Sequence, residues 1–316
     1  MAANRTKKHV LQVNVFDYMD ALVLRKRQIG KDSTADLYRA ASNWFRKFKN
    51  TRRVFLSEIT PTVVDGFIVY LQSQGTLKAN SVNSYISAFR AMYNVAIRES
   101  GYIPRIYPFA HITIHPGKTT KRAVGLDVFE EISSLKLEDK PELQKAADLC
   151  IFSFLACGMP FVDLVHLTRK NIEGDTLIYN RTKTGSPIRI DITPGMRCFI
   201  DKYALPDNPY LFSLLPQDGI ISHEHYKVLL RNYNKLLKKI GSRLGLETPL
   251  TSYVVRHSWA TIAYRKYTPV AVISQALGHT SEKTTRHYLA QLDQSELSKA
   301  NILITGTVDK IVRLRA

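Results

Sequence analysis

Residues 277–293 read LGHTSEKTTRHYLAQLD, the most informative stretch of the chain. The stretch carries a histidine, His279, and a tyrosine, Tyr288, with a Thr-Thr-Arg-His step between them that is typical of a helix. Either residue alone indicates little, because the chain has 16 tyrosines and most helical tyrosines half-bury a ring. The spaced string Leu-Gly-His-Thr-Ser…Thr-Thr-x-x-Tyr is far more specific than its parts.

This stretch resembles the nucleophile box of the tyrosine recombinases, the phage integrase family. In that family the tyrosine attacks a DNA phosphate and becomes joined to the 3′ phosphate. A phenol has a pKa of about 10 and is a poor nucleophile at neutral pH. Such a site therefore needs fixed cations around the charged phosphorane and a general acid for the leaving 5′ oxygen. The resemblance implies that Tyr288 is the nucleophile, that His279 belongs to its site, and that no metal or cofactor is needed.

Two further strings carry the resemblance. Residues 251–266, TSYVVRHSWATIAYRK, resemble the second family box, with Arg256 in the arginine place and Tyr253 in the upstream place that usually holds His. A guanidinium is always charged and holds two phosphate oxygens at once, and a phenol can still donate a hydrogen bond. Lys183 stands in a Lys-Thr-Gly string near a predicted hairpin tip, where the family places its general-acid lysine.

The first box departs from the family pattern. A Thr-Gly-Leu-Arg-like string normally places Arg two positions after Gly, but residues 157–160 read CGMP and place Pro160 there. Proline supplies neither a charge nor a donor. Arg181 and Arg169 are candidate replacements by sequence proximity only. Either another cation replaces the missing guanidinium in an active enzyme, or the chain binds DNA without cleaving it.

The composition favours a polyanion as the partner. The formal net charge is +18, and basic residues outnumber acidic ones on both sides of residue 116. Such an excess is typical of nucleic-acid binding, and its spread indicates that both halves contact the polyanion. Charge alone does not separate DNA from RNA. The family resemblance implies double-stranded DNA.

The sequence predicts a cytoplasmic protein without a metal centre. The three cysteines make neither a disulfide framework nor a zinc site, and Cys150 and Cys157 lie in the apolar run LCIFSFLAC, which is typical of core thiols. The longest apolar runs fall far short of the roughly 20 residues of a membrane span. The N-terminal MAANRTKKHV leads into no apolar signal segment.

Residues 10–104 are predicted to form an all-α domain. Apolar periodicity predicts a helix from Val15, a second capped by Ser33 or Thr34, a third that starts at Thr60-Pro61, and a fourth over residues 80–98. This half loosely resembles the core-binding domain of the same recombinases, which is a small helical bundle.

The resemblance assigns DNA contacts to the fourth helix. Small polar residues and arginine suit phosphate contacts near a helix N-terminus, and a solvated face is the alternative for any one of them. The residues expected to face DNA are Asn80, Ser81, Asn83, Ser84 and Arg90.

Residues 105–125 are predicted to link two domains, because prolines, glycines and a basic cluster interrupt the periodicity. A basic linker that crosses a duplex would let the two domains clamp it from opposite sides. Its expected DNA-contacting residues are Lys118, Lys121 and Arg122.

Residues 126–316 are predicted to form the catalytic domain, mainly α with a small β-hairpin. Strands are expected over 175–180 and 187–192, with a turn over 182–186 that carries Lys183. Helices are expected from Asp127 and over residues 141–157, 194–204 and 222–244.

The resemblance implies a site-specific recombinase that performs two successive transesterifications. Lys183 would protonate the leaving oxygen, and Arg256, His279 and Tyr253 would stabilise the phosphorane. Protomers that are monomeric when free would act as a homotetramer on two paired DNA sites. The little room before residue 14 favours an invertase or a Xer-like resolvase, with integration, excision and inversion all left open. A catalytically impaired DNA-binding regulator and a monomeric type IB topoisomerase are the alternatives.

Overall fold

The structure, a computed structural model, describes residues 14–114, 122–137, 139–216, 218–219, 221–289, 301–302, 304–308, 310–311 and 314, without the side chains of His287 and Tyr288. It divides into two compact units, Met1–Thr119 and Thr120–Ala316. Among the described residues, no helix combines the length and the apolar character needed to cross a membrane.

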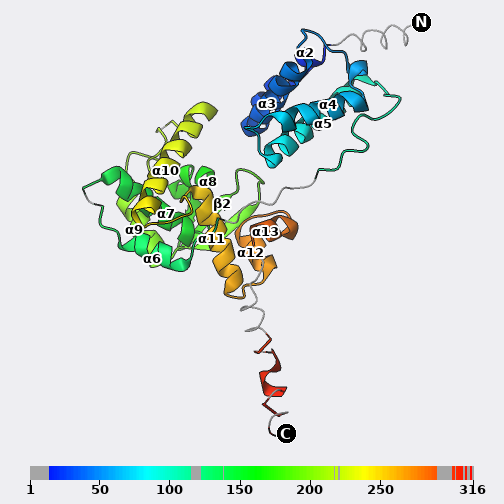
Figure 1. Cartoon of the computed structure of the whole chain (residues 1–316). Coiled ribbons are helices and arrows are strands. Elements are labelled where there is room, and N and C mark those ends of the chain that lie inside the picture. Colours follow the sequence, from blue (N-terminus) through cyan, green and yellow to red (C-terminus); the bar gives the residue numbers. More distant parts are fainter. Residues whose placement is uncertain are drawn as a thin grey trace. The chain divides into compact units, whose positions relative to one another are not determined.

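The first unit is helical, as predicted (Figure 1). The Thr60 hydroxyl accepts a hydrogen bond from the Val63 amide, so the expected cap of the third helix is confirmed. The second helix instead begins at Asp32 with no side-chain cap, so the predicted capping by Ser33 or Thr34 is wrong. Arg27 fixes this start by pairing with carboxylates of the helix's first turns. The elements are α2 (Val15–Gln28), α3 (Asp32–Lys49), η1 (Leu56–Glu58), α4 (Pro61–Ser73) and α5 (Ala79–Ser100).

Aromatic rings in tilted and edge-to-face contact fill the core of the first unit. Phe45 lies 4.4 Å from Phe89 between ring centroids, and Phe89 lies 5.5 Å from Phe109. Phe109 is 2% exposed, and Arg90 donates a 2.7 Å hydrogen bond to the Ile112 carbonyl. The chain therefore stays packed on the helical unit beyond residue 104, the predicted end of that domain.

The second unit is mainly α with one small antiparallel sheet of order β1-β2-β3, which confirms the predicted fold class. The hairpin pairs Leu177 with Ile190 and Asn180 with Pro187, so the turn that holds Lys183 follows directly. The elements are α6 (Leu126–Ser134), α7 (Pro141–Leu155), α8 (Phe161–Val165), η2 (Arg169–Asn171), β1 (Ile172–Glu173), β2 (Thr176–Asn180), β3 (Pro187–Asp191), α9 (Pro194–Tyr203), α10 (His223–Arg243), α11 (Ser252–Arg265), α12 (Val270–Ala276) and α13 (Glu282–Tyr288).

Helix α7 is central to this unit. It contacts α6, α9, α10 and α11, and it is buried over most of its length, as its long apolar run predicts. Helix α11 contributes Val254 and Val255 to the same core. Further along, its Ala260 packs with Ile273 and Leu277 in a smaller cluster. Arg256 therefore lies where α11 passes from the main core to the last two helices.

Candidate active site

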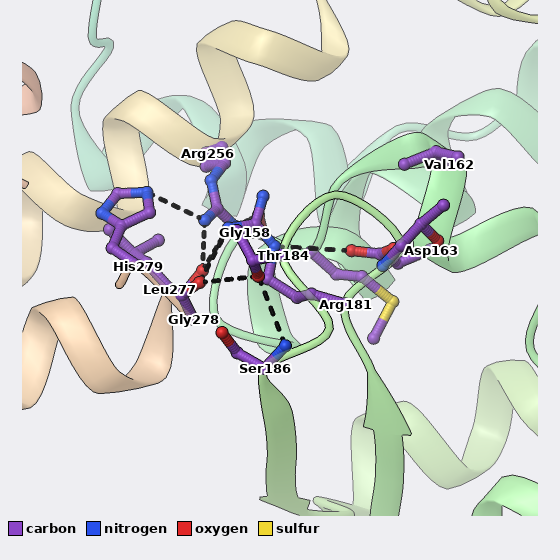
Figure 2. Close-up of polar contacts among 12 residues, drawn as sticks. Gly158, Val162, Asp163, Arg181, Thr184, Ser186, Arg256, Leu277, Gly278 and His279 are labelled. Atoms are coloured by element: carbon purple, nitrogen blue, oxygen red, sulfur yellow. Dashed lines mark hydrogen bonds and ion pairs between the residues drawn. The ribbon is translucent and has the colours of Figure 1, made fainter. Parts of the chain in front are cut away.

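Arg256 is the most firmly held cation of the site. It is 5% exposed, and its Nη1 donates a 3.0 Å hydrogen bond to the Gly158 carbonyl. Its Nη2 donates to the Leu277 carbonyl and lies 3.3 Å from Nε2 of His279 (Figure 2). The guanidinium thus joins the loop after α7 to the turn after α12.

Close backbone packing holds the first-box string against α11. Gly158 has φ +68°, and a Cβ there would lie 2.9 Å from the Cα of Arg256. Glycine alone tolerates both the left-handed backbone and this approach. Pro160 follows two residues later as the N-cap of α8. The string that lacks the expected arginine therefore lies beside Arg256.

His279 is neutral in this surrounding. Burial, together with the positive charges of Arg256, Arg181 and Lys183, lowers its pKa to about 4. Its Nδ1 lies 2.8 Å from the hydroxyl of Thr285, which is fully buried. Because a guanidinium only donates, Nε2 accepts from Arg256 and the ring proton belongs on Nδ1, which donates to Thr285.

A second arginine lies in the same cluster. Arg181 follows β2, is 7% exposed, and donates from Nη1 to the carbonyls of Leu277 at 3.0 Å and Gly278 at 3.1 Å (Figure 2). Its Nε lies 3.7 Å from Oδ2 of Asp163, a buried carboxylate on α8. The other carboxylate oxygen accepts a 2.9 Å hydrogen bond from the Thr182 amide. Arg181 thus joins α8, the hairpin and the turn between α12 and α13.

The hairpin brings Lys183 to this cluster. Lys183 is exposed in the turn between β2 and β3, and the hydroxyl of the next residue, Thr184, donates to the Gly278 carbonyl at 3.3 Å. Its charge acts on the His279 ring. Tyr253 lies one turn before Arg256 on α11, is 54% exposed, and stands edge-on to the His257 ring at 4.2 Å.

Tyr288 is the last residue of α13, and its side chain lies outside the described side chains. Helix α13 contacts α11 and α12. Thr285, which contacts His279, precedes Tyr288 by three positions on the same helix. The backbone of the expected nucleophile is therefore one turn from a direct contact of His279.

Two supporting residues were missed by sequence reasoning. Asp163 orients Arg181, and Thr285 fixes the His279 ring. Thr285 belongs to the Thr-Thr step of the nucleophile box, which was a usable signal. Asp163 lies three residues after Pro160, but nothing in its local pattern indicated a partner in the hairpin.

The predicted DNA-contacting residues lie in separate places. Asn80, Ser81, Asn83 and Ser84 occupy the first two turns of α5, where the Ser84 hydroxyl donates to the Asn80 carbonyl at 2.8 Å. Arg90 lies over the Phe109 ring at 5.6 Å in addition to its bond with Ile112. Arg122 is exposed in the second unit. Lys118 and Lys121 lie outside the described residues.

Within the described part of the chain, no group of three or more His, Cys, Asp or Glu side chains is arranged to hold a metal ion.

Family models match both units of the chain. The phage integrase SAM-like domain matches residues 14–113, and the phage integrase family matches residues 129–295. Tyrosine recombinase XerD of Halalkalibacterium halodurans is 25% identical over 236 residues, which cover 73% of this chain and 77% of that protein. Tyrosine recombinase XerC of Leptospira interrogans is 20% identical over 267 residues, which cover 82% and 83%.

Solved structures share the fold. A lambda integrase dimer bound to a COC′ core site has a TM-score of 0.66 at 17% identity, covering 93% of this chain and 83% of that one. The Tn1549 transposon integrase in complex with transposon right end DNA has a TM-score of 0.64 at 16% identity, covering 93% and 100%.

Proposed function

The chain belongs to the phage integrase family and is a site-specific tyrosine recombinase, and we propose that it breaks and rejoins DNA through a 3′-phosphotyrosine on Tyr288. The observation that carries this proposal is the contact chain from Arg256 through His279 to Thr285, on the helix that ends at Tyr288. A buried guanidinium and a neutral imidazole are thereby linked to the helix that carries Tyr288.

The reaction is a transesterification at phosphorus. The Tyr288 Oη forms a bond to phosphorus while the bond from phosphorus to the 5′ oxygen breaks. Lys183 donates a proton to that leaving oxygen, and the phenolic proton passes to water. A 5′ hydroxyl of the partner strand then reverses the step, so the bond energy is conserved and recombinant DNA is formed.

Fixed groups stabilise the phosphorane. Arg256 needs no rearrangement to act, because the Gly158 and Leu277 carbonyls already orient its guanidinium. His279 supports this cation in its neutral form, because its Nε2 accepts from Nη2 of Arg256 and its Nδ1 is held by Thr285. Tyr253 donates a further hydrogen bond from one turn upstream on α11.

Both units contact the duplex. In the first unit the phosphate contacts come from the start of α5, and further contacts come from the basic segment 118–122. The contacting residues are Asn80, Ser81, Asn83, Ser84, Arg90, Lys118, Lys121 and Arg122. The guanidinium of Arg90 is already engaged with Ile112, so its contribution is the smallest.

Four protomers act together on two synapsed DNA sites, and the free protein is a monomer in the cytoplasm. Support comes from a lambda integrase structure described as a tetramer bound to a Holliday junction, with a TM-score of 0.64. Integration, excision and inversion all remain compatible with this chemistry.

Covalent trapping tests the proposal. Nicked duplexes from the inverted repeats that flank the gene lose the short strand after cleavage, so the covalent complex accumulates. We expect a denaturant-stable, protease-sensitive adduct with the wild-type chain. The adduct should be absent with Tyr288→Phe and retained with Tyr203→Phe, whose hydroxyl contacts Asp148 instead. DNA binding without any adduct would support a non-cleaving regulator of the same fold.

A further inference from the structure

The string at residues 157–160 lacks one of the positively charged side chains that the family pattern places around the scissile phosphate. Gly158 holds this string against Arg256, yet Pro160 offers no charged group at the place where the family pattern has a guanidinium. A phosphorane carries more negative charge than its parent phosphate, so the loss of one cation raises the barrier. A replacement must come from another element that reaches the same cluster.

Arg169 does not supply that replacement. Its Nη2 donates to the carbonyls of Ala204 at 3.2 Å and Leu205 at 2.8 Å, and its Nη1 lies 3.4 Å from the Pro206 carbonyl. Both terminal nitrogens are thus bound to the loop that follows α9. Arg169 stabilises that loop rather than the site.

Arg181 lies in the site itself. Its Nη1 and the Nη2 of Arg256 donate to the same oxygen, the Leu277 carbonyl, so the two guanidinium groups are direct neighbours. Burying two like charges side by side is unfavourable unless an anion joins them. In the described part of the chain, Arg181 has an ion pair with Asp163, whose Oδ2 lies 3.7 Å from Nε of the arginine. The cluster therefore retains an excess of positive charge.

The contacts of Arg181 leave part of its guanidinium for a ligand. Its Nε and the facing Oδ2 of Asp163 are both buried and without a hydrogen-bond partner in the described structure. None of the described contacts of Arg181 involves Nη2. Because Nε faces the Asp163 carboxylate and Nη1 is bound to two carbonyls, the donor that remains for an anion is Nη2.

The segment that lacks the expected arginine also helps to hold Arg181 in place. Pro160 caps the short helix α8, and Asp163 on that helix faces Nε of Arg181 and accepts from the Thr182 amide. The carboxylate thereby orients both the arginine and the hairpin that carries Lys183. Pro160 and the carboxylate that faces Arg181 are thus three residues apart, at the start of one short helix.

We propose that Arg181 supplies the guanidinium that Pro160 lacks and binds a non-bridging oxygen of the scissile phosphate beside Arg256. This inference rests on the proposed function. As the Tyr288 oxygen bonds to phosphorus and the 5′ oxygen leaves with a proton from Lys183, Arg181 neutralises charge on an oxygen that takes part in neither bond. It is thus a catalytic residue through electrostatics alone.

The assignment is tested by removing the charge of Arg181 and, separately, one charged oxygen of the scissile phosphate. Arg181→Gln keeps a planar donor but removes the charge, and Arg169→Gln is the matched control at an arginine bound to carbonyls outside the site. Each variant is assayed for adduct formation on nicked duplexes with a normal scissile phosphate and with a methylphosphonate there. The methylphosphonate lacks one charged oxygen, so its transition state needs one cation less.

On the phosphate, Arg181→Gln is expected to slow adduct formation about 100-fold or more, and Arg169→Gln less than about threefold. On the methylphosphonate, the loss caused by Arg181→Gln should shrink at least about tenfold. Because the same preparation meets both linkages, this comparison does not depend on the folded fraction. If the glutamine variant does not fold, Arg181→Lys receives the same comparison, because it keeps the charge but loses the fork.

An equal loss on both linkages would show that Arg181 only supports the structure, and a wild-type rate on the phosphate would also overturn the assignment. Failure of the proposed function looks different, because then the wild-type chain forms no adduct on either linkage.

Discussion

The ionisation of His279 depends on the assembled site. It lies among three cations, and burial together with their charges lowers its pKa from 6.5 to about 4. Between these two values the unfolded chain binds more protons than the folded chain. The neutral ring therefore stabilises the fold fully above pH 6.5, and this contribution is lost as the pH falls toward 4.

We expect His279→Gln to flatten this part of the stability profile. Glutamine fills a similar volume and does not titrate, so the fall in the free energy of unfolding between pH 6.5 and 4 should be smaller than in the wild type. Urea unfolding at several pH values measures this. His225→Gln, at an exposed position in the first turn of α10, should keep the wild-type slope. An unchanged slope in His279→Gln would contradict the buried, neutral state.

At the scale of single residues, the sequence predicted those site residues that stand in short, recognisable motifs. The box around His279, the Tyr-Val-Val-Arg string of Arg256 and the Lys-Thr-Gly of Lys183 all come from short spacings. The role of Arg181 could not be predicted in this way, because its partners, the carbonyls of residues 277 and 278, lie nearly a hundred positions away. Sequence proximity left Arg169 and Arg181 equal, and only tertiary contacts separate them.

The turn between α12 and α13 is the element on which the site depends. Gly278 has φ +60°, and a Cβ there would lie 2.5 Å from Cδ of Arg181 and 2.8 Å from Cδ1 of Ile188. The close approach lets the Leu277 and Gly278 carbonyls reach Arg181. A side chain at this position must move either the hairpin or the turn.

Gly278→Ala is expected to destabilise the second unit by about 1–3 kcal/mol and to slow adduct formation. Gly245→Ala separates the two causes, because Gly245 has a similar φ of +68° but no atom within 4 Å of its Cβ position. It therefore shares the backbone strain without the collision. Thermal unfolding and adduct assays compare the two variants. Equal losses of stability and of adduct formation would contradict a role for the close approach of Gly278 to Arg181.

Elements were predictable where the pattern is local and long. The Thr60-Pro61 start of α4 and the hairpin around Lys183 follow from capping and alternation. The start of α3 was predicted wrongly. The ion pairs of Arg27 with Asp32 and Asp36 override the preference of Ser and Thr for the N-cap position. Strand β1 has only two residues and gives no periodic signal.

At the scale of the whole molecule, the charge is carried by two units that each have a separate core. The division near residue 119 lies later than the predicted end of the helical domain at 104. Phe109 is the reason, since its ring packs against Phe89 and Tyr93 after the proline-rich segment begins. Composition marked that segment as irregular but could not show which unit it packs on.

If both units bind phosphates, removing the first should weaken the salt dependence of DNA binding. Each neutralised phosphate contributes about 0.9 to the slope of log K against log salt concentration. We expect the full chain to have a steeper slope than the fragment Thr120–Ala316, by about 0.9 for every phosphate that the first unit binds. Titrations at several salt concentrations measure both slopes, and equal slopes would contradict phosphate binding by α5.

The most direct test of the central claim is to map the covalent adduct by mass spectrometry after protease digestion. The account predicts one modified peptide, with Tyr288 joined to the 3′ phosphate of the cleaved strand and a free 5′ hydroxyl on the released strand. An adduct on another residue, or one joined to a 5′ phosphate, would contradict it.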